Sequence, residues 1–406
     1  MFSATRRISL LIDGQIFDYW TRVSITRDMS EISASFEVEL RDGARNLQSW
    51  PYASATGPGS PFAICQPITV LIDNEPVLIG YVDEVHPKSG ENGLSVTLSG
   101  RDKTGDLVDC AASIKGPTEF KGLTLDKIAE KICEPFGISV RAEADVGDPF
   151  DKFSIDVGET AMSAIEKGAR QRALLVMSDG IGALILTQSG KTRAPGDLRF
   201  PGNIIESSGA FSAKERFSDY YVKGQISNGG AKKRGKAGLD VTAQPLGADE
   251  PLPQPDPKRE SKSVSSMGHA KDEEITRYRP SVSQVRTQAK QKDAQTQAEW
   301  QARTAKSKGE KLEYKIFDWR INGMLWRPNQ LCFVDDSYQD INRDMLIDGV
   351  TFTYSNDETG TSLRLTGPYA YDLQEEGERK KNRKNKGKKG KGGGSKGGLD
   401  GTAHAL

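Results

Sequence analysis

The chain of 406 residues is long enough for several domains, because a single hydrophobic core stops growing well below this size. Its four cysteines form no C-x-x-C pair and its three histidines lie far apart, which argues against a disulfide framework, a zinc ribbon and an H-E-x-x-H metalloprotease. The net charge of zero is unevenly distributed: Arg379 to Lys396 holds ten basic residues and no acid, which leaves 46 bases against 55 acids in residues 1–378.

Nothing in the sequence predicts a membrane segment or an export signal. The apolar run Ile8–Ile12 is too short for the hydrophobic core of a signal peptide, and nowhere do 18 apolar residues follow one another. We therefore expect a soluble protein made in a cytoplasm, with no stable membrane insertion.

Residues 1–103 show the alternation of half-buried β-strands. Asp13–Gly14 and Asp73–Asn74 supply turn residues, and the stretch from Asn46 to Pro61 has the composition of a surface loop. The segment therefore predicts a first antiparallel β domain. Apolar residues stand two apart at Ile8, Leu10 and Ile12, at Val23 and Ile25, at Phe36, Val38 and Leu40, at Ile68, Val70 and Ile72, and at Leu94, Val96 and Leu98.

The apolar period changes to that of helices in residues 104–205. Thr124 can cap a helix that Pro135 and Gly137 end. A second helix is predicted near Thr160–Gln171, followed by a hairpin turned by Asp179–Gly180. This pattern predicts an α+β domain. The apolar face of the first helix consists of Leu125, Ile128, Ala129, Ile132 and Cys133.

The second half of the chain mixes strands, one polar helix and low-complexity segments. Ser281 to about Lys308 lacks Gly and Pro, which predicts a long helix that braces domains or packs on a partner. Strand alternation returns at Leu312–Ile321, Gln330–Asp335, Met345–Phe352 and Thr361–Leu365. The predicted segments are return strands at 206–226, an exposed linker or insertion at 227–270, the long helix at 271–310, a second β domain at 311–374 and a disordered Lys/Gly-rich tail at 375–406.

Two hairpins far apart in the chain have similar sequences. Residues 79–101 and 347–368 each read as a strand, a turn and a second strand bounded by glycine, with nearly the same spacing between their glycines. One interpretation is that they are the same element of two duplicated β domains. The other is that any two hairpins with Gly-bounded strands look like this.

Four sequence motifs, in order along the chain, resemble the baseplate hub proteins of Mu-like contractile phages. The resemblance covers roughly residues 5–373. It implies a chain that is mainly β with α+β, containing two tube-type antiparallel β-barrel domains, an intervening α+β domain and one long helix. The family is related to the hub part of type VI secretion spikes, which carry hub and spike in one chain. The motifs are Ile79-Gly-Tyr-Val-Asp-Glu-Val, Ser99-Gly-Arg-Asp-Lys-Thr-Gly-Asp-Leu-Val-Asp-Cys110, Gly158-Glu-Thr-Ala-Met-Ser-Ala-Ile-Glu-Lys, and Leu325-Trp-Arg-Pro-Asn329 followed by Met345-Leu-Ile-Asp-Gly-Val350.

The same resemblance implies a structural protein of the virion tail baseplate, assembled in the host cytoplasm. The implied assembly is a homotrimer that adapts the sixfold tail tube to a threefold spike. The implied partners are other copies of the chain, a trimeric spike protein on a separate polypeptide, the tail tube protein, baseplate wedge proteins and the tape measure protein. If the repeated hairpins occupy repeated positions in a ring, their strands are candidate edge contacts. The candidate ring-interface residues are Ile79, Tyr81, Val85, Ile347, Val350 and Phe352.

A peptidoglycan-cleaving tail enzyme is the first alternative. Glycan cleavage needs two carboxylates at a defined separation, and the candidates are Asp83 with Glu84, and Asp335 with Asp336 and Asp340. Solvated turn acids are the commoner explanation for such residues, and a charged loop explains 335–344 better than a calcium site does. The sequence therefore predicts no enzyme.

The histidines and tryptophans point the same way. His86 lies in a turn and His269 in the predicted linker, so neither indicates a catalytic triad or a metal site. Trp319 and Trp326 either anchor a partner or pack in a core. We expect no catalytic residue, no metal ligand and no cofactor.

The basic tail is the last candidate site. Its charges would bind a polyanion in a salt-dependent way, but without aromatic residues they cannot read a base sequence, so no specific nucleic acid is expected. A polyanion-binding protein is therefore the second alternative, with a solubilising tail as the simpler explanation. The residues concerned are Arg379, Lys380, Lys381, Arg383, Lys384, Lys386, Lys388, Lys389 and Lys391.

Overall fold

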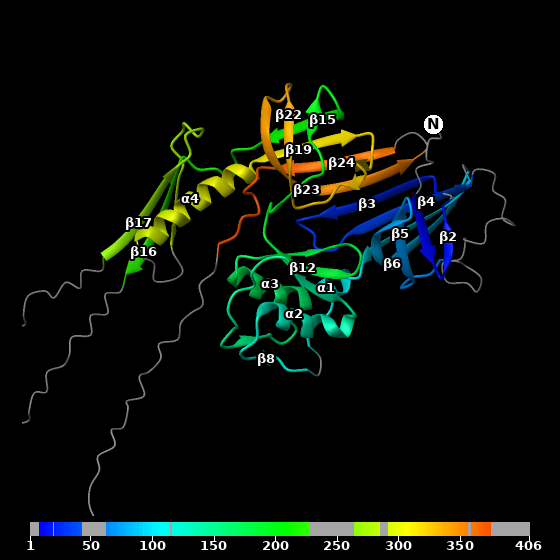
Figure 1. The fold of residues 1–406 in the computed structure, drawn as a ribbon, viewed down its shortest axis with the longest axis horizontal. Helices are drawn as coiled ribbons and strands as arrows, with labels where there is room; N and C mark the ends of the chain where they lie inside the picture. The colour runs from blue at the N-terminus through cyan, green and yellow to red at the C-terminus, as the bar shows by residue number, and fades with distance from the viewer. Residues whose placement is uncertain are drawn as a thin grey trace, which may run out of the picture.

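The computed structural model describes residues 8–18, 20–42, 62–91, 93–113, 116–226, 264–284, 291–355 and 359–374. Figure 1 shows a large sheet, an α+β body below it, and a smaller sheet with one helix at the left. Most of the strand pairs are antiparallel, so the prediction of a mainly β chain with antiparallel sheets is confirmed.

The largest sheet has fourteen strands, drawn from both ends of the chain. They are β1 (Ile8–Ile12), β2 (Gln15–Phe17), β3 (Arg22–Asp28), β4 (Ser35–Asp42), β5 (Pro67–Ile72), β6 (Glu75–Gly90), β7 (Gly93–Asp102), β13 (Thr192–Arg193), β14 (Leu198–Phe200), β15 (Ile204–Phe211), β19 (Glu310–Ile316), β22 (Gln330–Asp336), β23 (Ile341–Ser355) and β24 (Thr359–Thr366). The main path runs β15-β19-β24-β23-β3-β4-β7-β6-β5-β1-β2, and β22 joins β23 to β13 and β14. A separate hairpin follows β19, with strands β20 (Arg320–Ile321) and β21 (Met324–Leu325).

The structure agrees only in part with the prediction of two β-barrel domains. No sheet in the described ranges closes on itself, because the main path ends at β15 and at β2. The two β segments are also not separate, since β23 pairs with β3 in one continuous sheet. β6 has different neighbours along its length: residues 75–81 pair with β5 and residues 80–90 pair with β7.

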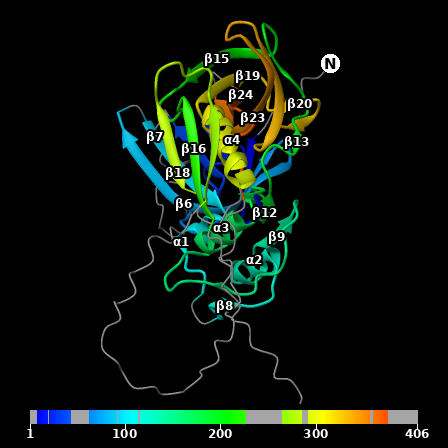
Figure 2. The same cartoon turned by 90° about the vertical axis from the view of Figure 1, so that its left-hand side faces the viewer.

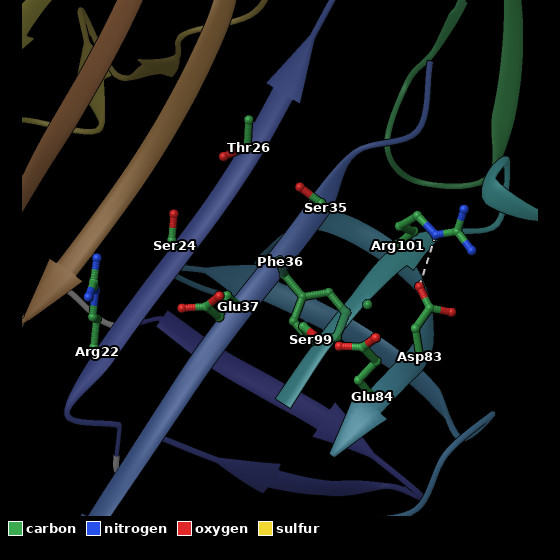
Figure 3. A pocket seen from close by; sticks show the side chains of 11 residues that line it. Arg22, Ser24, Thr26, Ser35, Phe36, Glu37, Asp83, Glu84, Ser99 and Arg101 are labelled. Atoms are coloured by element: carbon green, nitrogen blue, oxygen red, sulfur yellow. Dashed lines mark hydrogen bonds and ion pairs between the residues drawn. The ribbon is translucent and has the colours of Figure 1, made fainter. Parts of the chain in front are cut away.

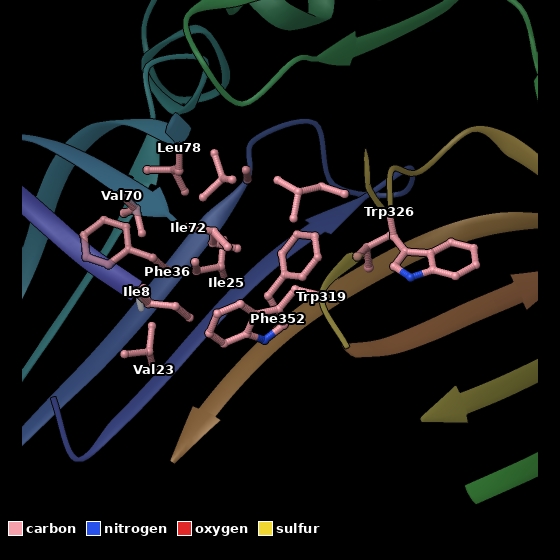
Figure 4. Close-up of a cluster of buried hydrophobic side chains, with 14 of the residues drawn as sticks. Ile8, Val23, Ile25, Phe36, Val70, Ile72, Leu78, Trp319, Trp326 and Phe352 are labelled. Carbon is pink, nitrogen blue, oxygen red and sulfur yellow. The ribbon is translucent and has the colours of Figure 1, made fainter. Parts of the chain in front are cut away.

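The core of this sheet follows from the strand alternation. Val23 and Ile25 on β3 and Phe352 on β23 are almost fully buried on one face, whereas the serines and threonines between them lie on the other. Figure 4 shows how these side chains meet those of β5 and β6. Trp319 and Trp326 are 1% and 0% exposed, so both pack in the core and neither anchors a partner.

The α+β body consists of α1 (Gly105–Asp109), β8 (Glu119–Phe120), α2 (Leu125–Cys133), the 3-10 turn η2 (Glu134–Phe136), β9 (Ser139–Ala142), β10 (Phe153–Ser154), α3 (Ala161–Gln171), β11 (Leu175–Ser178) and β12 (Ala183–Thr187). Both predicted helices and the hairpin are confirmed. Gly137 has a φ of 64°, the left-handed conformation that ends helices. The body has its own apolar core between α2, α3 and the β11–β12 hairpin.

The third body consists of β16 (Asp219–Ile226), β17 (Val264–Lys271), β18 (Pro280–Gln284) and α4 (Gln291–Lys308). It corrects two predictions. The residues Val264 to Ala270 of the predicted linker form a strand paired with β16, and the predicted helix start at 281–284 is a strand parallel to β16. β16 needs a partner on each edge for its backbone groups, and that tertiary demand overrides the helical periodicity of 281–284. Residues 227–263 and 285–290 lie outside the described ranges.

α4 connects this body to the large sheet. Seen end on in Figure 2, β16, β18 and α4 lie in front of that sheet and α2 and α3 lie below it. The Ser307 carbonyl accepts hydrogen bonds from Thr366 Oγ1 at 2.9 Å and from Gly367 N at 3.1 Å. Trp300 Nε1 donates to the Asp372 carbonyl at 3.1 Å. The last turns of α4 are thereby fixed to the segment that follows β24.

Candidate assembly interface

The large sheet contains one arrangement of strands twice. Along its path, β6-β7-β4-β3 is followed directly by β23-β24-β19-β15. We call these unit 1 and unit 2. In each unit a hairpin comes first, β6–β7 or β23–β24, and two further strands follow in the same antiparallel order.

Three local features recur at matching positions of the two units. The register shifts at Asp83 in β6 and at Asp348 in β23, a β-bulge in each case. Cys65 and Asn329 have φ angles of 63° and 64°, unusual for residues other than glycine. Their N–H groups donate to the carbonyl just before each bulge, Val82 at 2.7 Å and Ile347 at 2.8 Å. Shared bulges and shared strain favour duplication over a chance likeness of two hairpins.

The two units meet at a junction inside the chain, where β3 of unit 1 pairs with β23 of unit 2. The Thr26 and Thr351 hydroxyls are 3.2 Å apart across this pair. Beyond the end of β3, Met29 N donates to the Asp348 carbonyl at 2.8 Å. Asp28 accepts a hydrogen bond from the Arg364 guanidinium of β24. Backbone pairing and one ion pair therefore hold the units together.

On its core side the junction is apolar except for Arg27, near the end of β3. Arg27 of β3 donates to the Asp179 carbonyl at 2.6 Å, at the tip of the β11–β12 hairpin. Burial lowers the pKa of Arg27, and the nearby Arg327 lowers it further, while Asp102 and Asp179 oppose the change. The hairpin tip is also fixed to β6, since Ile79 N donates to the Gly180 carbonyl at 2.8 Å. The α+β body thus covers the junction.

Among the described residues, two strand edges of the repeated arrangement have no paired strand. Within these ranges, residues 84–89 of β6 pair with β7 alone, and β15 pairs with β19 alone. Large apolar side chains are exposed beside both edges: Phe211 at the end of β15 is 60% exposed, and Ile64, next to Val82, is 56% exposed. Unpaired backbone groups beside exposed apolar side chains are typical of a strand-pairing interface.

The predicted ring-interface residues divide into two groups. Val85 lies on the open edge of β6, whereas Ile79 and Tyr81 lie where β6 also pairs with β5. Ile347, Val350 and Phe352 are buried in β23, whose edge pairs with β3 inside the chain, so they belong to the strand at the contact between the two units and not to an open edge. Sequence alternation identifies strands but not their neighbours, and for that reason the prediction missed β15, the strand whose edge is open.

The solvent face of unit 1 is polar and hollowed. Its groove of about 690 Å³ is lined by hydroxyls of Ser24, Thr26, Ser35 and Ser99. Figure 3 shows Asp83 and Arg101 at one side of the groove, joined by a 2.9 Å ion pair. Arg101 also contacts Asp109 at 2.7 Å. Short hydroxyl side chains with paired charges make a hydrated wall without an apolar pocket for a small ligand.

Four of the five candidate catalytic acids, Asp83, Glu84, Asp335 and Asp336, have other partners. Glu84 contacts His86 Nε2 at 2.8 Å, and this contact holds the pKa of Glu84 below its ordinary value, whereas a general acid needs a raised pKa. Asp335 accepts from Asn342 at 3.1 Å, and Asp336 accepts from the N–H of Tyr338 at 2.9 Å in a turn. Asp340 has a φ of 55° in that same turn.

The other candidates from the sequence are His269, metal ligands, membrane helices and the basic tail. His269 stacks on Tyr221 with ring centroids 4.5 Å apart and contacts Asp219 at 2.9 Å. Within the described ranges, no group of three His, Cys, Asp or Glu side chains could hold a metal ion. Nor is any described helix long and apolar enough to cross a membrane. The basic residues from Arg379 to Lys391 lie outside the part of the chain that the structure describes.

Comparison with known proteins identifies families and relatives that this chain resembles. Residues 7–102 match the N-terminal domain of Mu phage baseplate assembly protein GpP-like proteins, residues 104–188 match the second domain of gp44-like baseplate hub proteins, and residues 290–376 match the fourth domain of GpP. The chain is 31% identical to baseplate hub protein gp44 of Escherichia phage Mu over 364 residues, which is 88% of this chain and 86% of the relative.

Two solved structures share the fold over most of the chain. The 43 kDa tail protein of prophage MuSo2 from Shewanella oneidensis is 29% identical with a TM-score of 0.72, covering 91% of this chain and 100% of that one. The tail protein from Neisseria meningitidis MC58 is 21% identical with a TM-score of 0.64, covering 91% and 99%.

Proposed function

Because the chain belongs to the family of Mu-type phage baseplate hub proteins, we propose that three copies close into a ring joining a sixfold tail tube to a threefold spike. The family consists of structural components of the phage tail, and the proposal concerns how this chain assembles. The observation that carries it is the repeat of two units in one sheet, in which the last strand of unit 2, β15, and the first strand of unit 1, β6 beyond residue 82, each have an unpaired edge among the described residues.

Ring closure follows from the internal junction. There, the last strand of unit 1, β3, pairs with the first strand of unit 2, β23. The corresponding open strands are β15, the last of unit 2, and β6, the first of unit 1. Pairing β15 of one copy with β6 of the next repeats the same heterologous contact, and such contacts close into a ring when the rotation permits. Three copies then supply six similar units around one axis.

The two ends of this ring would differ in symmetry. At one end, the hairpin end, β6 turns into β7 and β23 turns into β24, so both units present the same element. At the other, the insertion end, β7 leads into the α+β body while β15 leads into the β16–β18 sheet and α4. Figure 1 shows these two bodies as different structures. The hairpin end thus approximates sixfold symmetry, and the insertion end has threefold symmetry only.

The difference in symmetry between the two ends suggests which partner protein binds at each end. We place the tail tube at the hairpin end, the spike at the insertion end, and the baseplate wedge proteins around the outer α+β bodies. The hydroxyl-lined face of the sheet would line the channel, within reach of the tape measure protein. Assembly would take place in the host cytoplasm.

The native mass of the purified chain tests the proposal. We expect a mass near three times 44.3 kDa, and with the spike protein of the same particle we expect one hub trimer bound to one spike trimer. Multi-angle light scattering gives both masses. A monomer that remains monomeric with spike and tube protein together would contradict the proposal, and loss of turbidity in a peptidoglycan suspension would then favour an enzyme.

A further inference from the structure

We infer that neighbouring copies are joined by residues 206–211 of β15 pairing with residues 85–90 of β6 in one fixed register, with Phe211 packed on Ile64 and Val85 of the neighbouring copy. The inference rests on the proposed ring and assigns its contact residues. The internal junction between β3 and β23 serves as the template.

The register comes from matching rows of paired residues across the two units. In unit 1, Ile25, Phe36, Gly100 and Val82 lie in one row across β3, β4, β7 and β6. In unit 2, the corresponding row is Gly209, Leu312, Leu365 and Ile347. Both rows end at the residue just before a bulge. Position 209 of β15 therefore corresponds to position 25 of β3.

The template then gives the pairs between copies. Within the chain, Ile25 pairs with Phe352, five positions after Ile347. The residue five positions after Val82 is Pro87, so Gly209 should lie opposite Pro87 of the neighbour. By the same count Phe211 lies opposite Val85 and Ala210 opposite His86. Because strand direction alternates along the whole path, the new pair is antiparallel, like the template.

Side chains at matching positions of the two units differ in solvent exposure, and the difference is the one that this contact between copies predicts. Val350 is fully buried at the internal junction, whereas the matching Val85 is only half-buried. Pro328, the residue before Asn329, is buried, whereas Ile64, the residue before Cys65, is 56% exposed. The side chains that a neighbour would cover in the ring are therefore the ones that remain uncovered in the single chain.

The chemistry of the two junctions also differs at one position. Arg27 of β3 corresponds to Phe211 of β15. Arg27 has the Asp179 carbonyl as acceptor and Asp102 nearby, whereas Phe211 would meet the apolar Ile64 and Val85. The proposed contact between copies is therefore apolar at the position where the internal junction carries a guanidinium.

Cysteine cross-linking tests the register, with a matched control inside the chain. Ala210→Cys with His86→Cys should oxidise to covalent dimers and trimers on non-reducing gels, in a background where the exposed Cys65 and Cys110 are serine. The control pair is Thr26→Cys with Thr351→Cys, the matching positions whose hydroxyls are 3.2 Å apart, and it should form an intrachain disulfide. Ala210→Cys with Lys88→Cys, out of register, should give little product.

Phe211→Arg tests the side-chain contact. We expect the concentration at which trimers dissociate to rise at least about tenfold, whereas Phe317→Arg, a change at another exposed phenylalanine, should leave it unchanged. A trimeric mass without cross-linking of residues 210 and 86, or with preferential cross-linking of the out-of-register pair, would contradict the inferred pairing of β15 with β6. The proposed function would still stand. A monomeric mass with no cross-link overturns both.

Discussion

Single charged residues stabilise the contact between the two units of the sheet. Asp28 is almost buried at the end of β3 and contacts Arg364 of unit 2. Burial alone would raise the pKa of Asp28, but hydrogen bonds from Ser30 and Arg364 outweigh burial and hold the pKa below its ordinary value. The carboxylate is therefore more stable as an anion in the folded chain than in the unfolded one.

The stability contributed by this pair should depend on pH in one direction. A lowered folded-state pKa means that the contribution is present above the unfolded-state pKa of Asp28 and is lost as the pH falls through the folded-state value. Asp28→Asn should lower the free energy of unfolding by about 1 kcal/mol or less at neutral pH, since Arg364 is half exposed, and by nothing at pH low enough to protonate Asp28. Urea titrations of both proteins at several pH values measure this. An equal difference at every pH would contradict it.

Whole elements are positioned by close backbone contacts as much as by apolar faces. α4 packs on β17 through Gly268, where a Cβ atom would lie 2.1 Å from the Ala294 carbonyl oxygen. The helix buries only Ala294 and Ala298 against Val222 at this contact. Small residues on both elements allow the backbones to approach closely. Few apolar side chains hold the helix to the sheet, so a larger residue at this contact cannot be accommodated by repacking.

Gly268→Ala should therefore displace α4 from its sheet. We expect a loss of about 1–3 kcal/mol, confined to the third body, because the added carbon meets backbone that cannot rotate away. Hydrogen exchange should become faster in α4 and β17 and remain unchanged in β3 and β4. Met267→Ala is the control, since Met267 is 48% exposed on the opposite face of β17. Unchanged exchange in α4 would show that the helix is held by its contact with the segment after β24 alone.

The whole molecule has one end where the units repeat and one where they differ. The α+β body and the third body both leave from strand ends that lie opposite the β6–β7 and β23–β24 turns, at the ends of β7 and β15. Symmetry matching between rings depends on the surface presented at each end, so this placement decides which partner each end can accept.

An electron microscopy reconstruction of the proposed trimer, with only threefold symmetry imposed, should show this difference directly. Density at the hairpin end should correlate with itself after a rotation of about 60°, and density at the insertion end only after about 120°. Equal sixfold correlation at both ends, or at neither, would contradict the assignment of tube and spike to the two ends.

The sequence by itself determined the local structure. Alternating apolar residues predicted strands of both units, the helical spacing of apolar residues predicted α2 and α3, and four motifs pointed to the family. Thr124 precedes α2 as predicted, but its side chain makes no capping hydrogen bond. These signals are local, since each depends on neighbours a few residues apart in the chain. Where a strand had to satisfy distant partners, as at 280–284, the local pattern predicted the wrong element.

Only the tertiary structure decided which strand edges are used. The pairing of β3 with β23 joins residues more than three hundred positions apart, and no periodicity encodes it. It placed Val350 and Phe352, which the sequence proposed as ring contacts, at the junction between the two units inside the chain. Among the described residues it left one edge of β15 unpaired, and the sequence did not single out that strand. The physical reason is that a strand has the same alternation whether its edges are paired or free, so the free edge appears only when all the other strands have been placed.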